Sequence, residues 1–184
     1  MARIPYPDHD ALPDDVRSFV GRISPMLNIY RMLPHAETSV YGFMKLGNAL
    51  LFKADLDPVL RELVILRVGY LSDAAYELHQ HVRVARHVGV ADEKIAAVRD
   101  DPEADLFSRL ERAVLRYTDE VVRDVKASDD AYAAVSSLLS HREISELTLT
   151  IGFYMMVCRF LENFEVEIED EGVIDPTVNM PPGR

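Results

Sequence analysis

The sequence predicts an all-α protein, and three observations carry that prediction. Apolar residues recur at helical spacings along most of the chain, and no segment alternates in the manner of a strand. Two Ser-x-x-Glu capping boxes, beginning at Ser108 and Ser140, mark helix starts. Asp57-Pro58 marks another, because Asp is a good N-cap and Pro is favoured in the first turn. With 184 residues, of which 48% are apolar, one domain with a full core is expected.

Breakers and caps set the expected order of elements. Residues 1–12 are expected to form an extended arm, followed by a short helix from Pro13 that ends before Ser24-Pro25. Further helices are expected over 34–52, from 58 to a break at 71–73, over 73–87, over 91–100, and after the caps Ser108, Ser128 and Ser140, the last reaching Phe160 or Phe164. The acidic remainder, 166–184, is expected to be a surface arm or frayed tail. A single domain over 1–184, with its core at about 34–165, is therefore predicted.

Composition narrows the function classes. A net charge of −11 argues against nucleic-acid and anionic-membrane partners, since both attract cationic surfaces. The most apolar stretch, 147–161, contains Arg159 and is shorter than the roughly 20 residues that span a bilayer, so we expect a core helix and no membrane segment. Cys158 is the single cysteine, which excludes an intramolecular disulfide and favours a reducing compartment. With no apolar run at the start, a cytoplasmic protein with a small-molecule substrate is expected.

The stretch 58–89 holds the one constellation that suggests chemistry. Its first helix is apolar nearly all round and should be buried, yet it contains Glu62. A buried carboxylate is costly, so Glu62 should be neutral, paired or hydrogen-bonded. The second helix carries Glu77 and His81, whose spacing of four puts both side chains on one face. We expect these three residues to form the catalytic group.

Four stretches, taken in order, resemble the carboxymuconolactone decarboxylase family, which also includes the alkylhydroperoxidase D (AhpD) type proteins. They are residues 3–5 (RIP), 60–68 (LRELVILRV), 76–82 (YELHQHV) and 146–154 (ELTLTIGFY). The resemblance implies an AhpD-like helical bundle built around a central helical hairpin. It also implies a homo-oligomer, commonly a trimer or hexamer, with active sites near the subunit interfaces.

The resemblance distinguishes two branches of the family. The peroxidase branch has a Cys-x-x-Cys-x-x-x-His motif, with a relay Glu on the preceding helix. Aligning its histidine on His81 puts Ala74 and Glu77 at the cysteine positions and the relay Glu on Glu62. A thiol peroxidase needs an attacking and a resolving thiol, so this chemistry is disfavoured. The decarboxylase-like branch has Tyr-Glu-(Trp)-x-x-His, which matches Tyr76, Glu77 and His81, with Leu78 in place of the aromatic residue.

The predicted function is a cofactor-free decarboxylase-like enzyme that acts on a small carboxylated lactone or related acid. His81 is the expected proton donor, Glu77 its orienting partner, and Glu62 a second acid whose pKa burial would raise. Arg67 and Arg83 are alternative candidates to grip the substrate carboxylate. Tyr76 and His79 are expected to add to the substrate site.

Other interpretations remain open at this point. The protein is alternatively a hydroperoxidase-type antioxidant, or a non-catalytic oligomeric binder of small molecules. Glu77–His81 is alternatively an exposed intrahelical salt bridge, and Glu62 a structural acid satisfied by Arg61 or Arg67. A metal site made of Glu77, His79 and His81 has poor geometry, so no metal is expected. Cys158 is expected to be a small buried hydrophobe.

Overall fold

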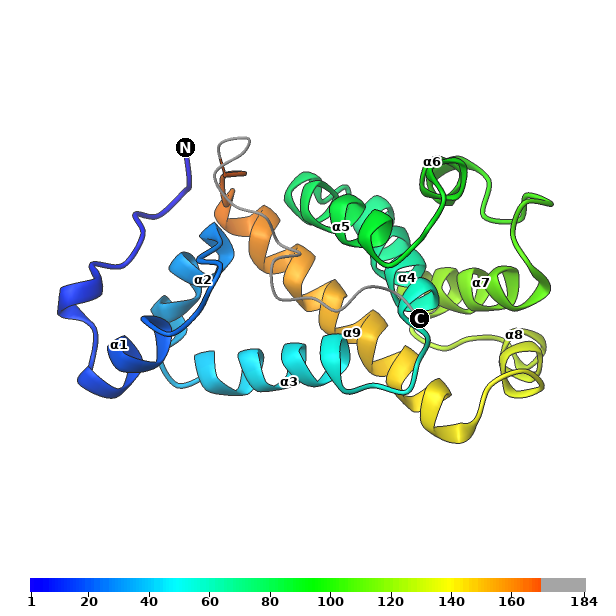
Figure 1. Ribbon diagram of the computed structural model, residues 1–184, viewed down its shortest axis with the longest axis horizontal. Coiled ribbons are helices and arrows are strands. Elements are labelled where there is room, and N and C mark those ends of the chain that lie inside the picture. Colours follow the sequence, from blue (N-terminus) through cyan, green and yellow to red (C-terminus); the bar gives the residue numbers. More distant parts are fainter. Residues whose placement is uncertain (170–184) are drawn as a thin grey trace.

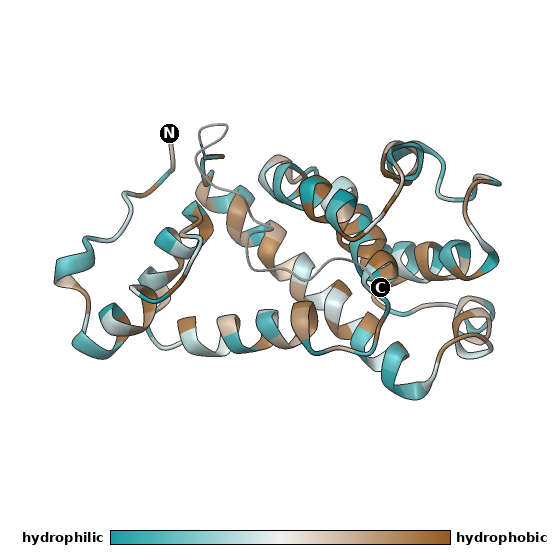
Figure 2. Ribbon diagram, viewed as in Figure 1, coloured by the Kyte–Doolittle hydropathy of each residue, from teal (hydrophilic) through white to brown (hydrophobic). Residues whose placement is uncertain are grey.

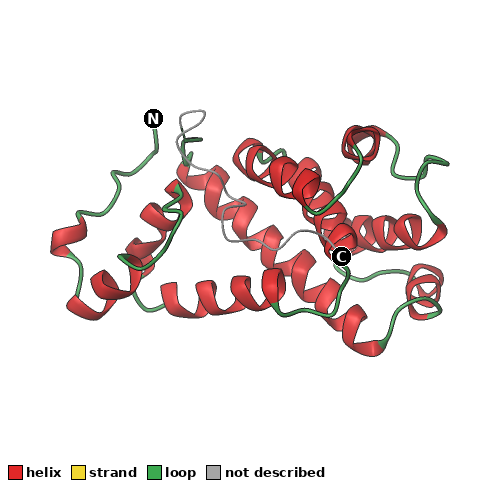
Figure 3. Cartoon of the chain, in the orientation of Figure 1, coloured by secondary structure: helices red, strands yellow, loops and turns green. Residues whose placement is uncertain are grey.

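Residues 1–169, the part that the computed structural model describes, form helices and loops without a strand (Figure 3). The α-helices are α1 (Asp14–Val20), α2 (Asn28–Met32), α3 (Val40–Phe52), α4 (Pro58–Leu71), α5 (Ala75–His87), α6 (Asp92–Asp100), α7 (Arg109–Asp124), α8 (Asp129–Ser136) and α9 (His141–Phe164). Two 3₁₀ turns, η1 (His9–Ala11) and η2 (Leu33–Ala36), complete the set. The all-α prediction is confirmed.

Helix α4 lies at the centre of the fold. It packs against α5, α6, α7 and α9, and every residue from Leu60 to Gly69 is buried. Figure 1 shows α9 running diagonally between α1–α3 and the group that contains α4–α8. Hydrophobic residues are concentrated along α4 and α9, as Figure 2 shows. Burial on all sides explains why the sequence of α4 is apolar all round.

The α4–α5 hairpin is tight because Gly69 has no side chain. A Cβ atom placed on Gly69 would lie 2.9 Å from Leu78 Cδ2 of α5. Such a distance is too short for a carbon–carbon contact, so a side chain at this position would force the Leu78 side chain to shift. The close approach brings the Glu62 face of α4 against the His81 face of α5.

The predicted helix caps are present. Ser108 with Glu111 and Ser140 with Glu143 form reciprocal capping boxes at the starts of α7 and α9. The Asp57 side chain accepts hydrogen bonds from the first backbone N–H groups of α4. Helix α9 is long and apolar enough to cross a membrane by length and composition, but half of its most apolar window is buried within the fold, as in a core helix.

Several predicted boundaries are wrong. The helix expected over 34–52 is divided into η2 and α3 by a turn at residues 37–39. Thr38 and Ser39 lie in that turn, where hydroxyl side chains compete with helical hydrogen bonds. Helix α5 begins at Ala75 instead of residue 73, because Asp73 has a positive φ of 52°. Helix α2 was not expected.

The start of the acidic segment is packed, contrary to the surface arm or frayed tail predicted for it. Val166 is buried, and its N–H donates to the Leu161 carbonyl. Arg3 donates its backbone N–H to the Phe164 carbonyl and its side chain to Glu165, so the two ends of the described chain lie together. The rest of the predicted tail, 170–184, lies outside the described residues.

Candidate active site

His81 lies between two carboxyl groups on the central hairpin. Its Nδ1 is 2.7 Å from Glu62 Oε2 of α4, and its Nε2 is 3.1 Å from Glu77 Oε1, one turn earlier on α5. Arg61 Nε donates to the other Glu62 oxygen at 2.9 Å. All four residues are buried, with Glu62 fully inaccessible. The structure thus brings Glu62, Glu77 and His81 together, and Glu77–His81 is not an exposed salt bridge.

The three groups have different protonation tendencies. Burial alone would raise the pKa of Glu62, but His81 and Arg61 outweigh burial and lower it. Burial would lower the pKa of His81, but Glu62 and Glu77 outweigh burial and raise it. Both shifts therefore favour the ionic form of the Glu62–His81 pair. This corrects the expectation that Glu62 is an acid with a raised pKa.

Glu77 is the carboxyl group that holds a proton more readily. Burial raises its pKa, His81 opposes that shift, and the charge of Glu62 adds to it. Its Oε1 atom, although close to His81 Nε2, is buried and lacks a hydrogen-bond partner of suitable geometry among the described residues. The series of contacts that starts at Arg61 therefore ends at Glu77 Oε1, an oxygen that is able to accept a further hydrogen bond.

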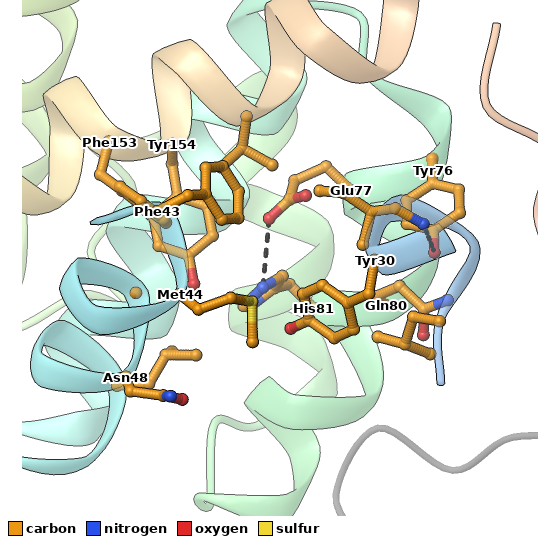
Figure 4. Close-up of a pocket in the computed structure, with 15 residues that line it drawn as sticks. Tyr30, Phe43, Met44, Asn48, Tyr76, Glu77, Gln80, His81, Phe153 and Tyr154 are labelled. Atoms are coloured by element: carbon orange, nitrogen blue, oxygen red, sulfur yellow. Dashed lines mark hydrogen bonds and ion pairs between the residues drawn. The ribbon is translucent and has the colours of Figure 1, made fainter. Parts of the chain in front are cut away.

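His81 borders two adjoining cavities. The inner one, of about 70 Å³, is lined by Glu77 and mostly by aromatic and apolar side chains, among them Phe43, Phe153 and Tyr154. The outer one, of about 300 Å³, shares Tyr30, Met44, Asn48, Gln80 and His81 with the inner one. Figure 4 shows Phe43, Met44, Phe153 and Tyr154 facing the Glu77–His81 pair across this space. An aromatic-walled cavity with a few polar groups is typical of a site for a small molecule.

Comparison with known proteins supports the family resemblance. Residues 39–120, which hold the hairpin and its acid–imidazole group, match the model of the Carboxymuconolactone decarboxylase family. The resemblance predicted from the sequence is confirmed over this segment.

Relatives in sequence and in structure agree with this placement. The uncharacterized protein YnjA of Escherichia coli K12 is 29% identical over 123 residues. The aligned part is 66% of this chain and 66% of YnjA, so the chain spans just under two thirds of that relative. A peroxidase-related protein from Ralstonia eutropha JMP134, described as an AhpD core, superposes with a TM-score of 0.78 at 20% identity, covering 92% of this chain and 93% of that one. The debrominase Bmp8, in a cysteine-to-alanine variant bound to 2,3,4-tribromopyrrole, gives a TM-score of 0.72 at 15% identity, with 92% and 94% covered. The AhpD-like fold is confirmed.

The residues predicted to grip a substrate carboxylate do not line these cavities. Arg67 points away from the cavities and forms a two-pronged pair with Asp119 of α7. Neither Arg83 nor His79 is among the residues that line either cavity, and those lining residues within 1–169 include no arginine or lysine. Tyr76 does line the inner cavity, and its hydroxyl accepts from Ile29 N at 3.3 Å (Figure 4).

Several cavity residues escaped the sequence analysis. The polar ones are Tyr30, Asn48, Gln80 and Tyr154. Gln80 follows Tyr76 by four on α5, as His81 follows Glu77, and that doubled spacing was the one available signal. Tyr154 lies in an apolar stretch that resembles ordinary core. Tyr30 and Asn48 come from α2 and α3, and no periodicity links those helices to the hairpin.

Cys158 and the potential metal-ligating side chains of the described residues bear on thiol and metal chemistry. Cys158 is fully buried on α9, and burial raises the pKa of its thiol to about 12. A thiol of that kind is a poor nucleophile at neutral pH, because the thiolate is the reactive form. Within 1–169, no group of three or more His, Cys, Asp and Glu side chains is placed to hold a metal ion.

Proposed function

We propose that this protein is an acid–base enzyme of the carboxymuconolactone decarboxylase type, which removes CO₂ from a small unsaturated ring acid or lactone without a thiol. One observation carries the proposal. The imidazole of His81 is fixed by Glu62 at the wall of an aromatic-lined cavity, with Glu77 beside its second nitrogen. A protonated imidazole held in such a cavity is suited to protonating a carbanion.

The reaction balances with the residues present. The bond between the substrate ring and its carboxylate breaks, CO₂ leaves, and the bonding electron pair passes into the conjugated carbonyl as an enolate. His81 Nε2 then gives its proton to the ring carbon, which restores a neutral product. Glu62 holds the imidazole through Nδ1 and stabilises its charged form. Glu77, whose pKa is raised by burial, returns a proton to Nε2 and is then reprotonated by water, which supplies the one proton that each turnover consumes.

The ligand of one relative and the lining of the cavity support a ring substrate. The debrominase of similar fold is bound to a small planar ring, a tribromopyrrole. The cavity here presents Phe43, Phe153, Tyr154 and Tyr30, and such faces suit a flat ring.

The test is turnover of carboxymuconolactone by the purified full chain, followed as loss of the lactone absorbance. His81→Ala should reduce turnover by roughly 100-fold or more, because general acid catalysis contributes about that much. His79→Ala is the matched control, since His79 is two residues away on α5 and outside both cavity linings. Full turnover in His81→Ala, with helicity intact, would refute the proposal.

Two other functions are distinguished by separate assays. A peroxidase is favoured by the name of the Ralstonia relative, and it predicts peroxide reduction with a dithiol donor that Cys158→Ser abolishes. A non-catalytic binder predicts ligand binding that His81→Ala leaves unchanged, with no product formed.

The proposal includes a cytoplasmic homo-oligomer, and exposed apolar residues on α9 such as Leu149 and Met156 support self-association. Light scattering of the purified protein measures the subunit number, and a monomer at all concentrations would remove this part.

A further inference from the structure

A carboxyl group of the chain itself is held at the edge of the inner cavity. Tyr76 Oη donates to Glu169 Oε1 at 2.6 Å, and Gln80 Nε2 donates to Glu169 Oε2 at 2.5 Å. The backbone N–H of Asn28 also donates to Oε1. Both carboxylate oxygens are thus bound by donors from α5 and α2. Tyr76 and Gln80 are 3% and 5% exposed, so this is a built site within the fold.

The same donors border the proposed catalytic space. Tyr76 and Gln80 both line the inner cavity beside Glu77 and His81, and Gln80 also lines the outer one. On α5 the pair at 76 and 80 precedes the pair at 77 and 81 by one residue, so the two pairs occupy neighbouring stripes of one helix. A molecule bound through Tyr76 and Gln80 therefore lies next to the imidazole.

Gln80 retains unused hydrogen-bonding capacity. Its Oε1 atom is buried and has no hydrogen-bond partner among the described residues. A buried amide oxygen without a partner is unfavourable, and a ligand hydroxyl or protonated acid would satisfy it. This observation is independent of Glu169, because it concerns the other end of the amide.

We propose that Tyr76, Gln80 and the Asn28 backbone N–H form the carboxylate subsite for a small ring acid, and that Glu169 fills this subsite until a ligand displaces it. The inference relies on the proposed function only for the choice of ring acid as the ligand. It supplies the carboxylate grip that the sequence analysis assigned to Arg67 or Arg83. Uncharged donors bind a carboxylate while leaving the charge balance of the Glu62–His81 pair unaltered.

Calorimetric titration of the full chain with benzoate, and with benzamide as the uncharged probe, tests the subsite. Glu169→Ala should tighten benzoate binding by about tenfold, the effect expected if Glu169 fills about nine tenths of the subsites in the absence of ligand. Benzamide affinity should change far less. Glu167→Ala is the matched control, since it removes an equal charge from the same segment while Glu167 contacts the chain's N-terminal amine instead.

A second pair of variants keeps the test decisive. In the Glu169→Ala background, Tyr76→Phe should weaken benzoate binding by about tenfold, the usual effect of losing one hydrogen bond to a charged group. Gln80→Leu is measured in parallel in case Tyr76→Phe disturbs folding, which circular dichroism monitors. The proposal is overturned by any of three results: no benzoate binding in any variant, equal effects of Glu167→Ala and Glu169→Ala, or no effect of either donor substitution.

The outcome is separable from that of the proposed function. Benzoate does not react, and its dependence on Glu169 should persist in His81→Ala. Binding that follows Glu169 without any lactone turnover would keep the subsite and reject the enzyme. If turnover requires His81 but benzoate binding does not depend on Glu169, the enzyme proposal is kept and the subsite is rejected.

Discussion

Two buried arginine–carboxylate groups on α4 differ in how completely they are satisfied. Arg67 contacts Asp119 at 2.5 and 2.7 Å, and its remaining Nη1 donates to the carbonyls of Val98 and Arg99. That group is closed and joins α4 to α6 and α7. The Arg61–Glu62 group continues through His81 and ends at Glu77, where Oε1 lacks a hydrogen-bond partner of suitable geometry. A saturated group holds helices together, whereas an unsaturated one at a cavity has capacity for a ligand.

The largest expected effect is on the closed group. Arg67→Ala should lower the free energy of unfolding by about 3–5 kcal/mol, because it leaves the mostly buried Asp119 without its main partner. Urea denaturation measures the change. Arg123→Ala is the control, since Arg123 reaches the same carboxylate at 3.3 Å from a side chain that is 57% exposed, and should cost less than about 1 kcal/mol. Equal losses in the two variants would contradict the structural role of Arg67.

The next effect concerns the open group. Glu62→Gln keeps the shape but removes the charge that raises the pKa of His81, so the His81 titration should move to lower pH. The unfolding free energy should fall by about 1.5–3 kcal/mol, as for other hydrogen bonds to charged groups. NMR titration of the imidazole measures the pKa of His81, and Arg67→Ala should leave that pKa unchanged. An unmoved His81 titration in Glu62→Gln would mean that the two groups are not coupled as described.

A smaller effect is expected from the contact that aligns the open group. Gly69→Ala should destabilise the chain by roughly 1–2 kcal/mol, because its methyl group would overlap Leu78 and push α5 away from α4. Gly152→Ala on α9 is the control, since nothing lies within 4 Å of a Cβ placed there, and it should be neutral or slightly stabilising. Denaturation of both variants side by side decides the point, and equal effects would show that the hairpin tolerates a wider spacing.

The smallest effect is a change with pH. The folded-state pKa of His81 is raised above its ordinary value of 6.5, so its stabilisation is complete below pH 6.5 and is lost as the pH rises through the folded pKa. The raised pKa of Glu77 acts in the same direction, from 4.5 upward. The lowered pKa of Glu62 gives stability that is present above pH 4.5 and lost in acid. Unfolding free energy should therefore decline above pH 6.5.

Glu77→Gln sharpens the pH experiment. The substitution removes the raised pKa of Glu77 and reduces the upward shift of the His81 pKa. The decline of the unfolding free energy above pH 6.5 should therefore become shallower. Stability that is flat from pH 6 to 9 in the unsubstituted chain, or a steeper slope in the variant, would contradict the assigned protonation directions.

Much of the fold followed from local signals. Caps at Asp57, Ser108 and Ser140 are short-range features, and each begins a helix as expected. Glu62 and His81 could be anticipated as partners because a buried acid on an apolar helix requires one. Their contact itself depended on Gly69, whose role is visible only once α5 is packed against α4.

The remaining features depend on distant segments. Arg61 and Arg67 lie on the same apolar helix, and nothing in that stretch tells which of them borders a cavity. Asp119, the partner of Arg67, comes from α7, and Glu169, which reaches Tyr76 and Gln80, follows α9. The predicted pKa direction of Glu62 was wrong because the sequence could not show that the attraction of His81 and Arg61 outweighs the effect of burial.

Cys158, the chain's single cysteine, has a practical consequence for the protein's working state. Its thiol is buried and resists ionisation, and among the described residues that line the two cavities beside His81 the only sulfur is the thioether of Met44. Oxidants and alkylating reagents therefore have no thiolate to attack beside His81. The groups that surround the imidazole are titratable, so the pH of the buffer should set their protonation state and a reducing agent should leave it unchanged.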